Sequence, residues 1–64
     1  MPEHFDVLDR DAGRSWCMDD EAEAIRYASG RHAHTGNVVE VVRSTPHGAS
    51  RILVLPSGAP LGRP

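Results

Sequence analysis

The histidines and the single cysteine are the side chains with which this chain could bind a transition metal. Zinc needs three or four nitrogen, sulfur or oxygen ligands that converge on one point. His32 and His34 are the closest pair, but residues two apart do not share a helix face, so they chelate one ion together only in an extended segment or a loop. His4, Cys17 and His47 are scattered along the chain, without a second pair at metal-ligand spacing. The sequence therefore predicts no metal site and no cofactor.

The segment from Asp9 to Gly13 carries alternating carboxylates, as the start of a calcium-binding loop does. Such a loop needs glycine where this chain has Arg14, and it needs a ligand where this chain has Gly13. The segments on both sides have the alternating pattern of strands rather than the pattern of helices. A hairpin turn therefore explains these residues better than a calcium site does.

Catalysis by Cys17 would need a nearby histidine and a third group that orients it. Cys17 lies in the middle of a predicted strand, where a small buried or interface thiol is the ordinary expectation. The carboxylates from Asp19 to Glu23 are explained by their position at the start of a predicted helix. A chain of 64 residues with one thin core also leaves little volume for a substrate pocket. We predict that the protein is not an enzyme.

Positive charge comes from arginine alone: seven arginines stand against nine carboxylates, and the net charge is −2. Nucleic-acid binding needs a positive field that neutralises phosphates, and this balance does not supply one over the chain as a whole. A local patch remains as an alternative, with Arg31, Arg43 and Arg51 as its candidate nucleic-acid contacts.

Two short strands joined by a turn are predicted near the N-terminus. Phe5 and Val7 alternate with polar residues, and Trp16 and Met18 share one face of the return strand. Between them, Gly13 suits the positive φ of a hairpin loop. The four apolar side chains are expected to lie together in the core.

A helix is predicted to begin after Asp20. With Asp20 as the N-cap, Glu23 follows three residues later, which is a capping-box arrangement. Small residues line the apolar side of this segment, so the helix can lie close to a sheet. Its predicted end is Gly30 or, in the longer version that we favour, Gly36, which is well placed for a left-handed cap.

Two valine-rich segments, Val38–Arg43 and Arg51–Leu55, are apolar on both faces if they form strands. The element order predicts an α+β fold of the ββαββ type, with a single antiparallel sheet in the strand order 2-1-3-4 and one helix packed on one face. Residues 1–55 are predicted to form the single domain. Residues 56–64 are rich in proline and glycine and are predicted to be a flexible tail.

One helix can shield only one face of such a sheet, so the uncovered face is predicted to bind a partner. The register decides which valines lie there, and the sequence leaves it open. Alternatively, loops or Leu61 of the tail shield that face. Because only 39% of the residues are hydrophobic, the core is thin, and the predicted partner is a second copy of the chain or, alternatively, an unidentified protein. The predicted interface residues are Leu8, Cys17, Val39, Val41, Leu53 and Leu55.

Four short motifs resemble those of a small bacterial family of domains of unknown function. They are Phe5-Asp6-Val7, Asp20-Glu21-Ala22-Glu23-Ala24, Val39-Glu40-Val41 and Gly48-Ala49-Ser50-Arg51-Ile52. The chain departs from that pattern in having Phe5 where tryptophan is commoner and in a slightly longer loop before Arg51. The resemblance implies a fold of a hairpin, a helix and further strands, and it implies no activity.

These observations predict a small, non-enzymatic module that acts by protein–protein contact as a homodimer. The N-terminus has neither a basic start nor an apolar run, so a cytoplasmic location is expected. The absence of lysine suggests a GC-rich bacterial or phage genome, and a phage or mobile-element accessory protein would fit the size and acidity. The alternative function is a nucleic-acid-binding regulator that uses the arginine patch.

Overall fold

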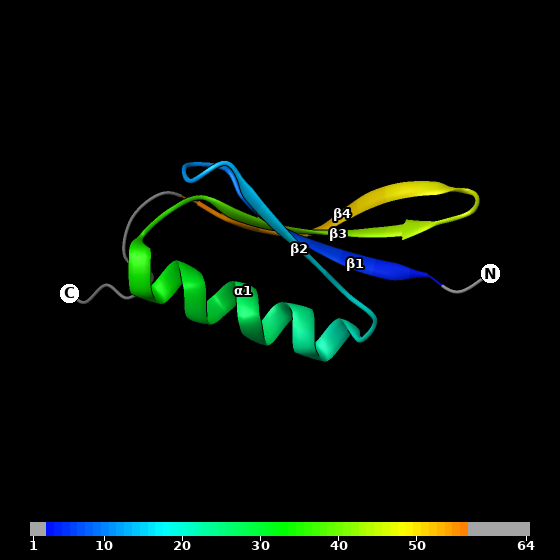
Figure 1. The fold of residues 1–64 in the computed structure, drawn as a ribbon, viewed down its shortest axis with the longest axis horizontal. Helices are drawn as coiled ribbons and strands as arrows, with labels where there is room; N and C mark the ends of the chain where they lie inside the picture. The colour runs from blue at the N-terminus through cyan, green and yellow to red at the C-terminus, as the bar shows by residue number, and fades with distance from the viewer. Residues whose placement is uncertain (1–2, 57–64) are drawn as a thin grey trace.

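The computed structural model describes residues 3–56, which form one antiparallel sheet with a helix across one of its faces (Figure 1). The elements are β1 (His4–Asp9), β2 (Arg14–Met18), α1 (Glu21–Thr35), β3 (Val39–Thr45) and β4 (Gly48–Leu55). The strand order is β2-β1-β3-β4 and every neighbouring pair is antiparallel. This confirms the predicted α+β architecture and strand order. The predicted tail, apart from Pro56, lies outside the described residues.

The turn between β1 and β2 is closed by Asp9 and Gly13. The Gly13 N–H donates to the carbonyl of Asp9 over 2.9 Å, and Gly13 has a φ of 67°. This left-handed conformation suits glycine because it has no Cβ. The turn places Asp6 opposite Cys17 in the register of the two strands.

Both predicted caps of α1 are present, and the helix has the longer of its two predicted extents. The Asp20 side chain accepts a 2.9 Å hydrogen bond from the Glu23 N–H at the first turn. At the other end, Gly36 has a φ of 72°, and its N–H donates to the His32 carbonyl over 2.7 Å. Within residues 3–56, no helix has the length and apolar character needed to cross a membrane.

The side of α1 that faces the sheet is narrow, with Ala24, Ala28 and His32 as its buried residues. The two alanines allow the helix backbone to approach the strands closely. The His32 ring makes a 2.6 Å hydrogen bond with the carbonyl of Pro56, so the imidazole has a partner despite its burial. The fully buried apolar core consists of Phe5, Val7, Ala24, Ala28, Val39 and Val41.

The faces of β3 differ from the predicted interface. Val39 and Val41 are opposite Asp9 and Val7 of β1, and paired residues point to the same side of a sheet. Val7 is packed under α1, so both valines are too, and each is 0% exposed. Their assignment to the uncovered face was therefore wrong, because the register turns Glu40 outward instead.

Strand β4 follows the register of β3 at its C-terminal end and has a bulge at Ile52. Leu55 and Leu53 are opposite Val39 and Val41, on the helix side, and they pack against the core. Their assignment to the uncovered face was wrong for the same reason. The register then shifts, so that Ile52 has no paired residue in β3. A bulge of this kind adds local twist and is typical of sheet edges.

Candidate functional site

The side of the sheet that faces away from α1 is the principal candidate surface, and we call it the open face (Figure 1). Its members follow from strand alternation and register. They are His4, Asp6, Leu8, Ser15, Cys17, Glu40, Val42, Ser44, Ala49, Arg51 and Val54. The open face is thus mixed in character, with apolar residues between charged ones.

Of the six predicted interface residues, the structure places Leu8 and Cys17 on the open face and the other four on the helix side. Sequence reasoning missed Val42 and Val54, which do lie there. The signal that could have found them is Glu40, because a carboxylate between two valines favours the side of the sheet away from the apolar core. If Glu40 faces away from the core, strand alternation places its neighbours Val39 and Val41 in the core.

Glu40 forms the charged centre of the open face. Arg10 donates two hydrogen bonds of 3.2 Å to its carboxylate, and Arg51 forms an ion pair with it at 3.4 Å. The Arg10 guanidinium lowers the pKa of Glu40, against the opposing effect of burial. The carboxylate is therefore ionised and fully partnered, as a structural group would be.

The three arginines predicted to contact nucleic acid do not form one surface in the part of the chain that the structure describes. Arg43 is opposite Phe5, on the helix side of the sheet, whereas Arg51 lies on the open face. Arg31 projects from α1. Each of the three is also paired with a carboxylate, at 2.7 Å for Arg31 and 3.4 Å for Arg43 and Arg51. Their binding of nucleic acid stays a prediction.

Asp9 is the most strongly perturbed carboxylate of the described residues, and its surroundings indicate a structural role. It is completely buried and accepts hydrogen bonds from the Arg31 guanidinium, the Ala12 N–H and the Asn37 amide. Arg31 is the main cause of a pKa lowered to about 2. Asp9 thereby joins the hairpin turn, the helix and the segment before β3.

Arg31 is also held by an aromatic side chain. Its guanidinium lies 4.8 Å from the centre of the Trp16 ring, and Tyr27 meets the same ring edge-on at 5.1 Å. Cation–π contacts of this kind fix the orientation of the guanidinium. The same contacts that seat Arg31 against Asp9 limit its freedom to reach a phosphate.

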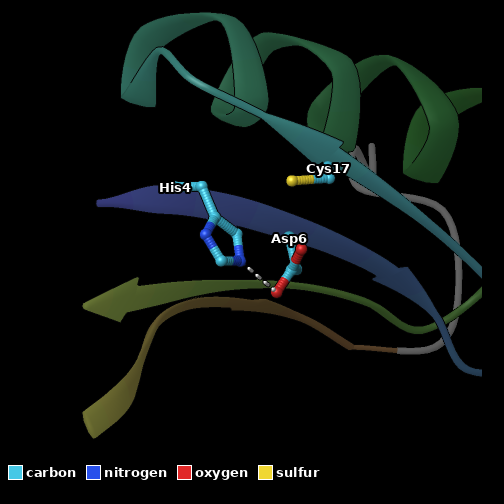
Figure 2. A group of neighbouring side chains, drawn as sticks. All are labelled: His4, Asp6 and Cys17. Atoms are coloured by element: carbon cyan, nitrogen blue, oxygen red, sulfur yellow. Dashed lines mark ion pairs between the residues drawn. The ribbon is translucent and has the colours of Figure 1, made fainter. Parts of the chain in front are cut away.

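One cluster on the open face combines three metal-ligating side chains: His4, Asp6 and Cys17 (Figure 2). His4 Nε2 lies 3.4 Å from Asp6 Oδ2, and one ligand atom from each residue lies within 4.8 Å of the other two. The Ser44 hydroxyl donates to the same Asp6 oxygen over 3.5 Å. Sequence reasoning treated His4 and Cys17 as scattered, whereas the hairpin register brings them together.

The same cluster gives no support to a catalytic cysteine. Loss of hydration and the nearby Asp6 carboxylate raise the pKa of the Cys17 thiol. A cysteine nucleophile is activated by the opposite shift, which a positive neighbour or a helix N-terminus produces. Cys17 on its own is therefore a protonated thiol with low nucleophilicity.

No family model, curated protein or solved structure matches this chain. The resemblance to a small bacterial family consequently rests on the ββαββ layout alone.

Proposed function

We propose that the protein is a non-enzymatic protein-binding module that forms a homodimer by pairing β4 with β4 of a second copy. The observation that carries the proposal is the position of β4 at the end of the sheet. It spans Gly48–Leu55, and within residues 3–56 its far side has no strand beside it. We call that side the β4 edge.

An unpaired strand edge presents a row of N–H and C=O groups that another strand can bind. The β4 edge is the longer of the two edges of this sheet, with eight residues against five in β2. The turn end of the β3–β4 hairpin also extends past the N-terminal end of α1, so the helix does not cover that part of β4 (Figure 1). Antiparallel pairing of two β4 strands would give hydrogen-bond partners to the free backbone groups of both edges, and a twofold axis would relate the two copies.

Apolar side chains on β4 supply burial beside the backbone hydrogen bonds. Val54 is 45% exposed on the open face, and Ile52 is partly exposed at the bulge. Burying such groups is favourable by about 25 cal/mol per Å². A second copy also compensates for the thin core, in which two of the six fully buried apolar residues are alanines.

Two features of β4 oppose indiscriminate aggregation. Arg51 places a charge on the strand, and the bulge at Ile52 interrupts its regularity. Both features are typical of edges that natural proteins protect. They favour one defined pairing of limited length over open-ended growth of the sheet.

Sedimentation equilibrium of the wild-type chain and Val54→Lys tests the proposal. The wild-type chain should approach twice its monomer mass of 7.0 kDa as concentration rises. Val54→Lys should stay monomeric, because it places a charge in the contact. Ala33→Lys adds the same charge at an exposed helical position and should still dimerise. A monomeric wild-type chain, or equal dimerisation by Val54→Lys, would overturn the proposal.

A further inference from the structure

We propose that His4, Asp6 and Cys17 form a zinc-binding site on the open face, a role independent of dimerisation. Strand geometry places the three residues together. Residues two apart on a strand point to the same side, so His4 and Asp6 are neighbours on β1. Cys17 of β2 is directly opposite Asp6. Figure 2 shows the imidazole, the carboxylate and the thiol around a common space.

The distances fit tetrahedral coordination. Zinc binds sulfur at about 2.3 Å and nitrogen or oxygen at about 2.0–2.2 Å, so neighbouring ligand atoms are roughly 3.2–3.8 Å apart. His4 Nε2 and Asp6 Oδ2 are already 3.4 Å apart. All three candidate ligand atoms lie within 4.8 Å of one another, so a shift of about 1 Å by the exposed Cys17 side chain would complete the geometry.

The combination of ligands selects the class of metal. A thiolate and an imidazole favour zinc over magnesium or calcium, which prefer oxygen ligands alone. Three protein ligands leave a fourth position for water, and the thiol proton is released to solvent when the metal binds. The Ser44 hydroxyl, bonded to Asp6 at 3.5 Å, would help to orient the carboxylate.

The site is open to solvent and distant in the sheet from the β4 edge. The side chains of His4 and Asp6 are 43% and 31% exposed, so an ion can enter without a change in the fold. The ligands belong to β1 and β2, two strands away from β4 at the nearest. Zinc binding and dimerisation can therefore fail separately in experiments.

Calorimetric titration of the untagged, reduced chain with zinc chloride tests the site, with cobalt chloride as a spectroscopic probe. One zinc ion should bind per chain, and cobalt should produce thiolate-to-metal charge-transfer absorption. Cys17→Ser should remove that absorption and weaken zinc binding by roughly tenfold or more. His4→Gln should weaken zinc binding similarly while circular dichroism stays unchanged.

The matched control is His47→Gln, which removes an exposed histidine from the β3–β4 turn and should leave zinc binding unchanged. The proposal is overturned if the wild-type chain binds no zinc at micromolar concentrations. It is equally overturned if binding is lost with His47→Gln or persists unchanged in both Cys17→Ser and His4→Gln. Either of these last two results would assign the bound zinc to ligands outside the His4, Asp6 and Cys17 cluster.

Discussion

Alanine substitution of two adjacent valines tests the assignment of the sheet faces. Val41 is 0% exposed beneath α1, between Val7 and Leu53, whereas Val42 is partly exposed on the open face. Val41→Ala removes two buried carbons, which costs about 1.6 kcal/mol in transfer free energy at about 0.8 kcal/mol each. The residual cavity raises the expected total to roughly 2–3 kcal/mol. Val42→Ala should cost less than about 1 kcal/mol, because water already reaches that side chain.

Urea unfolding followed by the fluorescence of Trp16 measures both changes. A domain of this size has a free energy of unfolding of only roughly 3–10 kcal/mol, so Val41→Ala should shift the midpoint clearly. All variants should be compared at a concentration where sedimentation shows monomers, so that dimerisation does not contribute. Equal losses, or a larger loss for Val42→Ala, would refute the register, since a slip of one residue exchanges the two faces.

Further predictions concern a buried charge and two glycines, Gly30 inside α1 and Gly36 at its C-cap. Because folding lowers the pKa of Asp9 from 3.8 to about 2, its stabilising contribution should be present above pH 3.8 and lost as pH falls toward 2. Between pH 3.8 and pH 2, unfolding should therefore take up a proton at this group, and the difference in urea midpoint between the wild-type chain and Asp9→Asn should shrink as the pH falls. A difference that stays constant with pH would contradict this cause. Gly36→Ala should destabilise by roughly 1–2 kcal/mol because φ is 72° there. Gly30→Ala should stabilise by roughly 0.5–1 kcal/mol, since an added Cβ meets nothing within 4 Å, and thermal unfolding of the pair should show opposite signs.

Features that depend on neighbouring residues could be predicted from the sequence. Asp20 marks the start of the helix because its side-chain oxygen accepts a hydrogen bond from a free N–H of the first turn. Gly36 marks the end because its left-handed conformation lets its N–H donate to a carbonyl of the last turn. Alternation and the short turn at Gly13 predict the first hairpin, and the order of hairpin, helix and hairpin leads to the strand order. These elements follow from local chemistry that no distant contact overrides.

The register decides which residues of β3 and β4 face the helix. The sequence does not reveal this register, because valines lie on both sides of β3. Glu40 was the informative residue there, because its partners Arg10 and Arg51 hold it on the open face. Asp9 shares the parity of Phe5 and Val7, which places it toward the helix. Its burial is balanced mainly by Arg31, with further hydrogen bonds from the Ala12 N–H and the Asn37 amide. Arg31 and Asn37 lie far along the chain, and no local pattern connects them to Asp9.

The metal-ligand cluster needed the same long-range information. His4 and Asp6 have strand spacing in the sequence, but Cys17 joins them only once the turn fixes which residue of β2 is opposite Asp6. A search for metal ligands in strands therefore has to consider pairs two apart together with the residue across the hairpin. Spacing along the chain alone does not reveal ligands that are far apart in sequence and close together in the sheet.

Amide hydrogen exchange along β4, measured by NMR at low and high protein concentration, tests the central claim most directly. If two copies pair through the β4 edge, the amides that face this edge should become strongly protected as concentration rises, while the edge amides of β2 stay unchanged. Dilution should reverse the protection. Exchange rates along β4 that do not depend on concentration, in a range where sedimentation reports dimers, would contradict edge pairing.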